Sequence, residues 1–347
     1  MTEKPLSDCR LPAEWEPQDG ILLAWPHADS DWQPLLKEIT AVYIELTRTI
    51  LQYQAVLIAT PEPETVKQQL AQATIDMTAV RIEDVPTNDT WTRDFGPITV
   101  LRETKPLLLD FEFNGWGAKF AADRDNQVTK RLHTAGSFGT TPRKAINLIL
   151  EGGSIESDGA GTILTTSKCL LNSNRNHHLD KKQIEQLLFR YLGAKQILWL
   201  DHGFLAGDDT DAHIDTLARL GPNDTITYVR CNDPQDEHYA ELLKMEEQLQ
   251  QLKTQTGAPF RLIPLPWPQA RHADNGDRLP ATYANYLVIN GAVLVPSYAD
   301  PADRVARTAI AAVYPDRDII SIDCRPVVRQ YGSLHCLTMQ LPEGVLS

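Results

Sequence analysis

Four short strings of the sequence combine titratable side chains with apolar neighbours, and they are the first candidates for chemistry. They are NDTWTRDFGP (88–97), LEGGSIE (150–156), GDDTDAHIDTLAR (207–219) and GSLHCLTMQ (332–340). A buried charge must be paired or used, because its desolvation is costly when it stands alone. Each string therefore predicts either a structural ion pair or part of a reactive site.

Cys336 is the candidate nucleophile. A thiol becomes reactive when a base or a positive charge lowers its pKa below the free value of about 8.5. His335 precedes it, but adjacent side chains on a strand point to opposite faces, so we expect His335 to be a poor partner for the sulfur. Without the other strings, Cys336 would better fit a small buried apolar side chain.

His213 is the better candidate for a general acid and base. In AHIDT, His213 and Asp215 are two residues apart. On a strand they would point to the same face, about 7 Å apart at the backbone, and could act on one ligand together. The alternative for so short a pattern is a structural histidine beside a surface aspartate.

The two remaining strings supply carboxylates. Asp94 and Trp91 lie near an expected turn, where Asp94 either faces a site with Trp91 as its apolar wall or pairs with Arg93 at the surface. Glu151 precedes two glycines, which allow the backbone to approach another group closely. Its carboxylate is either a charge at a strand end or the group that fixes the tautomer of a histidine.

A thiol, an imidazole and three carboxylates together suit a guanidinium substrate. A guanidinium is planar, permanently charged and rich in N–H donors, and carboxylates bind it in bidentate fashion. Its central carbon then stays open to a thiolate from one face. An acyl substrate would need donors for an oxyanion, near which carboxylates would be unfavourable. The surplus of acids therefore favours a cationic electrophile.

The surrounding sequence predicts alternating hairpins and helices. Apolar residues recur at helical spacing in 34–53, 62–73, 124–134, 179–194, 236–255 and 300–315, where Asp300 is the expected cap. Strand–turn–strand patterns occupy 96–113, 153–166, 213–230 and 286–296. Their turns recur at intervals of about 54, 64 and 69 residues, with a helix in each interval.

This loose repeat predicts a single α/β domain, 1–347, built from strand–helix modules around a central axis. The first strand (20–26) and the last (334–340) would share a module, which closes the ring and gathers the start of one strand from each module at a common mouth. The alternative is an ordinary doubly wound sheet with two lobes.

Composition limits the function classes. The 347 residues are 42% apolar and 23% charged, as in a globular protein, and the formal net charge of −13 disfavours a nucleic-acid partner. No segment has the length of a membrane helix and the N-terminal residues lack an apolar signal region, so we expect a cytoplasmic enzyme. Five widely spaced cysteines without a CxxC pair argue against a zinc site or a disulfide framework. We expect a homo-oligomer only because homo-oligomers are common among soluble proteins.

The strings also resemble a known family. Together with LPAEWEPQDGILLAWPH (11–27), CLLNSNRN (169–176) and YANYLVINGAVLVPSYAD (283–300), they are similar to the agmatine deiminase and bacterial-type peptidylarginine deiminase family of the guanidino-group-modifying superfamily. The resemblance covers nearly the whole chain. It implies a five-bladed, pentein-like pseudo-symmetric α/β propeller that needs no metal or organic cofactor.

The resemblance also implies roles for five residues. Cys336 matches the nucleophile, His213 the general acid and base, and Glu151 the acid that supports the histidine, while Asp94 and Asp215 match the carboxylates that grip the guanidinium. The implied reaction is hydrolytic deimination through a covalent thiouronium intermediate, which would turn agmatine into N-carbamoylputrescine and ammonia. The substrate cation itself should favour the thiolate.

Three questions stay open from the sequence. The family typically has several glycines before the nucleophile motif, whereas this chain has Gly332 alone in RQYGSLHC. Free or peptidyl arginine would need a cation for its carboxylate, for which the candidates are Arg93, Arg175, Arg219 and Arg329. Agmatine would need acids for its amine, for which the candidates are Asp208, Asp209 and Asp211; the alternative there is a solvated acidic turn. A non-catalytic protein that binds polyamine-like cations is the hypothesis from another class.

Overall fold

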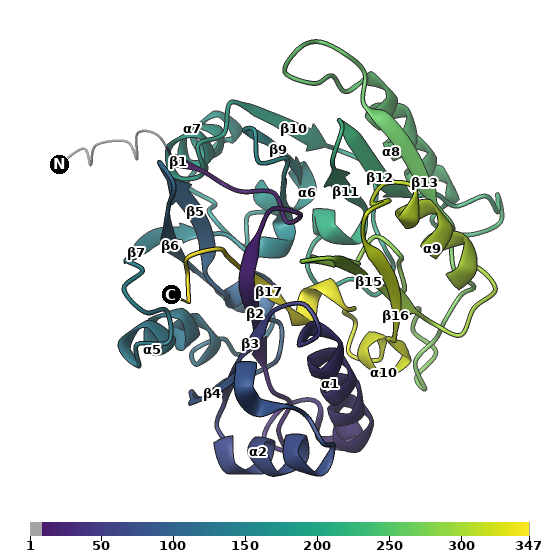
Figure 1. Cartoon of the computed structure of the whole chain (residues 1–347). Helices are drawn as coiled ribbons and strands as arrows, with labels where there is room; N and C mark the ends of the chain where they lie inside the picture. The colour runs from purple at the N-terminus through teal and green to yellow at the C-terminus, as the bar shows by residue number, and fades with distance from the viewer. Residues whose placement is uncertain (1–8, 347) are drawn as a thin grey trace.

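The computed structural model of the protein describes residues 9–346. Its longer helices lie at the periphery of the molecule, and the strands lie closer to its middle (Figure 1). The helices are α1 (Leu36–Ile50), α2 (Pro63–Gln72), α3 (Thr92–Phe95), α4 (Gly115–Ala118), α5 (Val128–Thr134), α6 (Ser167–Leu170), α7 (Lys181–Leu192), α8 (Tyr239–Gln251), α9 (Asp303–Ala311) and α10 (Arg325–Val328).

The strands of the described residues form five separate sheets. One sheet has the order β1 (Cys9–Arg10), β5 (Ile98–Arg102), β6 (Lys105–Glu112), β7 (Arg143–Ile149). The next two are β10 (Gln196–Leu200), β9 (Thr162–Thr166), β8 (Ile155–Ser157), and β11 (Ala218–Gly221), β12 (Thr225–Val229), β13 (Arg261–Leu265). The last two are β14 (Leu287–Ile289), β15 (Ala292–Ser297), β16 (Asp318–Asp323), and β17 (Met339–Pro342), β2 (Gln18–Ala24), β3 (Ala55–Thr60), β4 (Val80–Asp84).

Every sheet repeats one pattern. An antiparallel pair is followed by a strand that pairs in parallel with its second member, as in β11, β12 and β13. The parallel strand always follows a peripheral helix, because a parallel connection needs a crossover. The helices are α1 after β2, α5 after β6, α7 after β9, α8 after β12 and α9 after β15. The repeat expected from the spacing of hairpin turns is thus a repeat of whole modules.

The two ends of the chain meet in one module, as the sequence predicted. Strand β17 pairs antiparallel with β2, so that Met339 lies opposite Leu22. The helix predictions are confirmed within a few residues. Asp180 caps α7 in a capping box with Gln183, and Gly193 ends it in the left-handed conformation with φ 65°. Helix α9 begins at Asp303, because Asp300 instead accepts a hydrogen bond from the Ala302 N–H in the preceding turn.

Two predictions of local structure are wrong. His213 and Asp215 do not lie on a strand, because Ile214–Thr216 forms a 3-10 turn before β11. Cys336 likewise lies in the 3-10 turn His335–Leu337, and β17 starts only at Met339. The hydroxyls of Thr216 and Thr338 explain both turns, since each donates to the carbonyl oxygen three residues earlier, at 2.8 and 2.9 Å.

A large apolar cluster fills the space between the sheets and helices. It includes the whole of Ile21–Leu23 on β2 and most of β15, together with Trp25 and Trp32. A second cluster lies between β5–β7, β9 and α7. None of the helices in residues 9–346 is both long and apolar enough to span a bilayer.

Candidate active site

Five chain segments deliver the candidate residues to one place. Each lies two to four residues before the first strand of an antiparallel pair: Asp94 before β5, Gly153 before β8, Asp215 before β11, Asn285 before β14 and Cys336 before β17. The modules therefore place chemically different side chains at equivalent positions. These positions are the strand starts that the repeat predicted would gather at one place.

A pocket of about 110 Å³ opens at this place. Cys336, Asp94 and Trp91 line it, whereas His213, Asp215 and Glu151 are fully buried behind its wall. The other described residues that line it are Asp31, Asp89, Trp116, Phe120, Asp208, Asp209, Thr210, Thr216, Gln330, Tyr331 and Gly332. The lining therefore includes five aspartates and four aromatic rings, and no Lys, Arg or His among the described residues.

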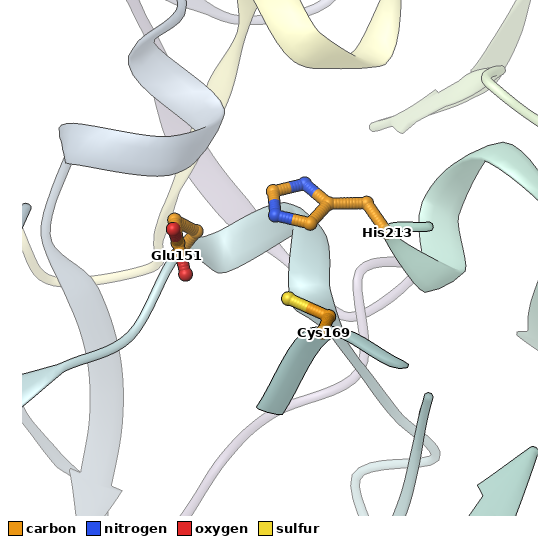
Figure 2. Close-up of side chains that lie close together, drawn as sticks. All are labelled: Glu151, Cys169 and His213. Atoms are coloured by element: carbon orange, nitrogen blue, oxygen red, sulfur yellow. The ribbon is translucent and has the colours of Figure 1, made fainter. Parts of the chain in front are cut away.

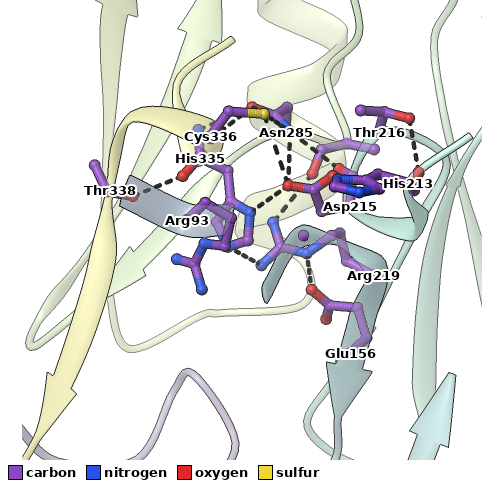
Figure 3. Close-up of polar contacts among 12 residues, drawn as sticks. Arg93, Glu156, His213, Asp215, Thr216, Arg219, Asn285, His335, Cys336 and Thr338 are labelled. Carbon is purple, nitrogen blue, oxygen red and sulfur yellow. Dashed lines mark hydrogen bonds and ion pairs between the residues drawn. The ribbon is translucent and has the colours of Figure 1, made fainter. Parts of the chain in front are cut away.

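Cys336 lies against an aspartate and an amide. Its Sγ is 3.8 Å from Oδ2 of Asp215, and Asn285 Nδ2 donates to the sulfur at 3.3 Å. Asn285 Nδ2 also donates to Asp215 Oδ2 at 3.2 Å. No donor from the described residues reaches the other carboxylate oxygen of Asp215, so Oδ1 is buried without a hydrogen-bond partner. Figure 3 shows this group together with the residues below it.

The electrostatics keep the thiol protonated when no cation is bound. Burial, and then the Asp215 and Asp94 carboxylates, raise the pKa of Cys336 well above its ordinary value. Burial is the largest single effect on Asp215 and favours its neutral form, but the hydrogen bond from His335 and the nearby positive charges together outweigh it and lower the pKa of that carboxyl. A cation in the pocket would reverse the effect on the sulfur, because it offsets both carboxylates.

His213 and Asp94 form the second part of the site. His213 Nδ1 lies 3.6 Å from Asp94 Oδ1, and neither ring nitrogen has a hydrogen-bond partner among the described residues. Burial alone would lower the pKa of His213, but Asp94, Cys169 and Glu151 raise it to about 10. Burial raises the pKa of Asp94 to about 6 in spite of the positive charge of His213. The imidazole is therefore placed to hold a proton next to a carboxylate that ionises near pH 6.

Gly153 permits this arrangement. Its N–H donates to Asp94 Oδ1 at 3.0 Å. A Cβ at this position would lie 2.7 Å from His213 Nδ1, 2.8 Å from Asp94 Oδ1 and 3.2 Å from Asp215 Oδ2. The close backbone approach expected of the two glycines after Glu151 thus occurs at the centre of the site.

Glu151 and Cys169 also lie close to the His213 ring (Figure 2). The ligand-type atoms of the three residues lie within 4.8 Å of one another, which is the spacing of a metal-ligand set. Arg175, however, donates to Glu151 Oε1 at 2.8 Å, and its buried guanidinium opposes a cation there. We interpret the cluster as a support for His213. Cys169 is a neighbour of the imidazole that sequence reasoning did not single out.

His335 does not act on the sulfur, as expected, but it has a role beneath the site. Its Nδ1 lies 2.8 Å from Asp215 Oδ2 and its Nε2 lies 2.6 Å from Glu14 Oε2. A guanidinium nitrogen of Arg219 also lies 3.0 Å from Nε2, so this nitrogen faces both a carboxylate and an arginine. Arg219 pairs with Glu156 at 2.5 Å (Figure 3). Arg219 also pairs with Glu14 at 3.1 Å. A buried ionic chain therefore anchors Asp215.

The arginines proposed for a substrate carboxylate lie elsewhere. Arg93 faces Gln340 and Glu14 rather than Asp94, so the alternative of an Arg93–Asp94 pair is wrong. Arg175 and Arg219 are buried in the ion pairs described above. Arg329 contacts Asp274 at the surface. None of the four lines the pocket.

The three aspartates of the string GDDTD have different surroundings. Asp208 accepts hydrogen bonds from Thr210 and from the Ala212 N–H, so it shapes its own loop. Asp211 is held by Lys119 and Arg175. Asp209 lines the pocket, and its carboxylate forms no hydrogen bond or ion pair with the described residues. Burial, and then Asp208, raise the pKa of Asp209. Asp209 is therefore the acid of this string that is available at the pocket.

Aromatic side chains form the pocket walls. Gly332 lets the chain pass against Trp91, because a Cβ there would lie 2.3 Å from the indole ring. The single glycine of the RQYGSLHC string thus lies where the backbone approaches the Trp91 ring most closely. Trp116 also lines the pocket, and its Nε1 donates to Asp94 Oδ2 at 2.9 Å. Trp116 adopts a left-handed backbone with φ 55°, a strained conformation for a bulky residue that is tolerated where the surroundings fix it.

Comparison with known proteins identifies the family of this chain. A model of the Porphyromonas-type peptidyl-arginine deiminase family matches residues 10–342. The chain belongs to this family. The resemblance inferred from the motifs is therefore confirmed.

Individual members of this family and its structural neighbours match over nearly full length. Agmatine deiminase of Pseudomonas syringae pv. tomato is 31% identical over 356 residues, which cover 96% of this chain and 95% of that protein. A cysteine-to-serine variant of C. jejuni agmatine deiminase, solved with substrate bound, matches with a TM-score of 0.90 and 41% identity over 97% of each chain. A dimethylarginine dimethylaminohydrolase, at 12% identity and a TM-score of 0.51, shares the fold alone over 93% of this chain and 100% of that one. The mixed α/β fold is thus that of guanidino-modifying enzymes.

Proposed function

We propose that this protein is a hydrolase that deiminates agmatine to N-carbamoylputrescine and ammonia through a covalent intermediate on Cys336. The observation that carries the proposal is the pocket lining. It joins a thiol to several carboxylates and aromatic walls, without a basic side chain among the described residues. Relatives named agmatine deiminase support it over nearly their whole length.

The assignment of agmatine rests on both ends of that molecule. Its guanidinium suits Asp94 and the unpaired Oδ1 of Asp215, close to the sulfur. Its apolar chain suits the space between Trp91 and Trp116, and its ammonium suits Asp209 or Asp89 at the mouth. The carboxylate of arginine would instead meet these aspartates, which makes free or peptidyl arginine the second candidate.

The proposed reaction has two halves. The Cys336 thiolate attacks the guanidinium carbon, so that a C–S bond forms, while His213 transfers its proton to the departing nitrogen and the C–N bond breaks to release ammonia. His213 then takes a proton from water, whose oxygen attacks the same carbon. Collapse breaks the C–S bond and frees the ureido product and the thiolate. Glu151 and Cys169 hold the imidazole throughout.

The five modules also support a finer description of the fold. We propose that the sheets are the blades of a five-bladed pseudo-symmetric α/β propeller, and that residues 1–347 form one catalytic domain. We further propose that the enzyme is cytoplasmic and acts on a small cationic substrate. It would need no cofactor and no nucleic-acid or membrane partner. Because homo-oligomers are common, we also propose that it assembles with itself.

Ammonia release tests the function. Agmatine, free arginine and a peptide with a C-terminal arginine are compared for the wild type, Cys336→Ala and Cys231→Ala, the last a buried cysteine outside the pocket lining. We expect release from agmatine by the wild type and by Cys231→Ala, and none by Cys336→Ala. Turnover by Cys336→Ala would remove the nucleophile from the proposal. Agmatine binding without ammonia release by the wild type would indicate the non-catalytic cation-binding protein instead.

A further inference from the structure

A second, wider hollow adjoins the Cys336 pocket. Its volume is about 640 Å³, and it lies between the acidic string GDDTD and the segment 272–278. Most of the residues that line it are exposed. Among the described residues, Asp209 and Tyr331 alone line both the hollow and the pocket. These two side chains therefore form the boundary between the narrow pocket and the wider hollow.

Tyr331 holds its place in this boundary at a conformational cost. Its backbone is left-handed, with φ 63°, a conformation that glycine adopts freely and bulky residues rarely. In residues 9–346 the one other aromatic residue with a positive φ is Trp116, which lines the same pocket. Strained residues cluster at ligand sites, where the surroundings fix them. A tyrosine at a position where glycine would be unstrained therefore indicates a function for the ring.

The chain is held on both sides of Tyr331. Before it, Gln330 Nε2 donates to the Asp31 carbonyl oxygen at 2.8 Å. After it, Gly332 lies against the Trp91 ring. The Tyr331 ring packs against the large apolar cluster, and its hydroxyl has no hydrogen-bond partner among the described residues. The bulk of the ring, rather than a polar bond of its hydroxyl, is thus what Tyr331 presents at the boundary.

The boundary lies at the end of the pocket where agmatine and arginine differ. With the guanidinium at Cys336 and Asp94, the ammonium of agmatine would lie at Asp209 or Asp89, and Asp209 shares the boundary with Tyr331. Arginine and its amides carry one more group on the carbon that bears this ammonium. The aspartates oppose that group when it is a carboxylate, but they do not oppose an uncharged carboxamide. A bulky ring opposes both.

We propose that Tyr331 is a specificity-determining residue, whose ring closes the outer end of the pocket and excludes guanidines with a branch on the carbon that bears the ammonium. The inference rests on the proposed deimination. It adds a steric element to the charge of the aspartates, and discrimination between related substrates commonly uses both. The ring would exclude peptidyl arginine as well as free arginine.

Argininamide is the probe, because it is agmatine with one uncharged carboxamide on that carbon. Ammonia release from each compound gives the ratio of kcat/KM for agmatine to kcat/KM for argininamide. Tyr331→Gly and Tyr331→Asn remove the ring and suit a left-handed backbone, whereas Tyr331→Phe keeps the ring. Glu103→Gly is the matched control, because Glu103 has φ 58° in the exposed turn between β5 and β6 and lines neither cavity.

We expect the wild type, Tyr331→Phe and Glu103→Gly to favour agmatine on the order of 100-fold, as expected for one group too many in a closed pocket. Tyr331→Gly and Tyr331→Asn should lower the ratio at least about tenfold, because kcat/KM for argininamide rises. The proposal is overturned by an unchanged ratio in either folded variant, or by equal use of both compounds by the wild type. Loss of folding in both variants would also overturn it, because the ring would then be a structural part of the core.

Binding separates this inference from the proposed function. Both compounds are titrated by calorimetry into Cys336→Ala, with and without Tyr331→Gly. If the wild type releases no ammonia from agmatine, the proposed function is refuted, but the ratio of the two Kd values still tests the ring. A ratio that falls about tenfold when the ring is removed supports the exclusion, and an equal ratio overturns it. Absence of agmatine binding would overturn both proposals.

Discussion

Gly153→Ala tests whether the close packing of His213, Asp94 and Asp215 is what the reaction requires. The new methyl group would lie 2.7 Å from His213 Nδ1, while ordinary contact begins at 3.4 Å. The imidazole or the backbone must therefore yield by about 0.7 Å, the difference between these distances. Misplacement of a reacting group by about 1 Å can cost about 10²-fold in rate. We expect kcat/KM for agmatine to fall on the order of 10²-fold, which equals about 2.7 kcal/mol.

The matched control separates this effect from backbone strain. Gly153 has no left-handed φ, so alanine there is conformationally acceptable. Gly136 is the converse case, with φ +79° and no atom within 4 Å of the position that an alanine methyl would take. Gly136→Ala should lower the free energy of unfolding by roughly 1 kcal/mol and leave kcat/KM unchanged. Steady-state kinetics and thermal unfolding of both variants are the assay. A Gly153→Ala enzyme with wild-type kcat/KM would show that the three side chains need not meet around this glycine.

The same contacts lead to three other expected outcomes. Since Asp94 must be ionised to hold a guanidinium and its pKa is about 6, kcat/KM for agmatine should fall as pH decreases through about 6; a flat profile down to pH 5 would contradict that role. His335→Gln removes the hydrogen bond that keeps the pKa of Asp215 low, so the KM for agmatine should rise about tenfold or more and the acid limb should move to higher pH, whereas a purely structural loss would leave the limb in place. Ammonia release should be insensitive to EDTA or dipicolinate; inhibition that zinc reverses would instead make Glu151, Cys169 and His213 a working metal site.

The sequence predicts the module plan because that plan rests on local signals. Turns such as Asn290-Gly291 and helices such as α7, with its cap at Asp180 and its stop at Gly193, are encoded within a few residues. The four chemical strings were found because each contains a titratable group that is costly to bury. The same search could not find Asn285, because an amide has no charge to mark it, although its place before the fourth hairpin was visible.

The backbone around the site was predicted less well. His213 and Cys336 were placed on strands because their neighbours are apolar, yet each lies in or beside a 3-10 turn. A local signal was available in EGGS, HIDT and HCLT, since the hydroxyls of Ser154, Thr216 and Thr338 each bond the carbonyl three residues earlier. The partners of His335 could not be predicted, because Glu14 and Asp215 are brought to it from modules 321 and 120 residues away in the sequence.

The same carboxylates that would bind the substrate also restrain the nucleophile. Burial, and then Asp215 and Asp94, raise the pKa of Cys336 in the free protein, which keeps it a poor nucleophile toward other electrophiles. A bound guanidinium offsets both negative charges within a few ångströms of the sulfur, so its arrival favours the thiolate that must attack it. The same two negative charges would then select a cationic substrate and, once it is bound, allow the Cys336 thiolate to form. A neutral ligand of the same shape would occupy the pocket without that effect, which is why agmatine and an uncharged ureido analogue should differ in reaction even where they bind alike.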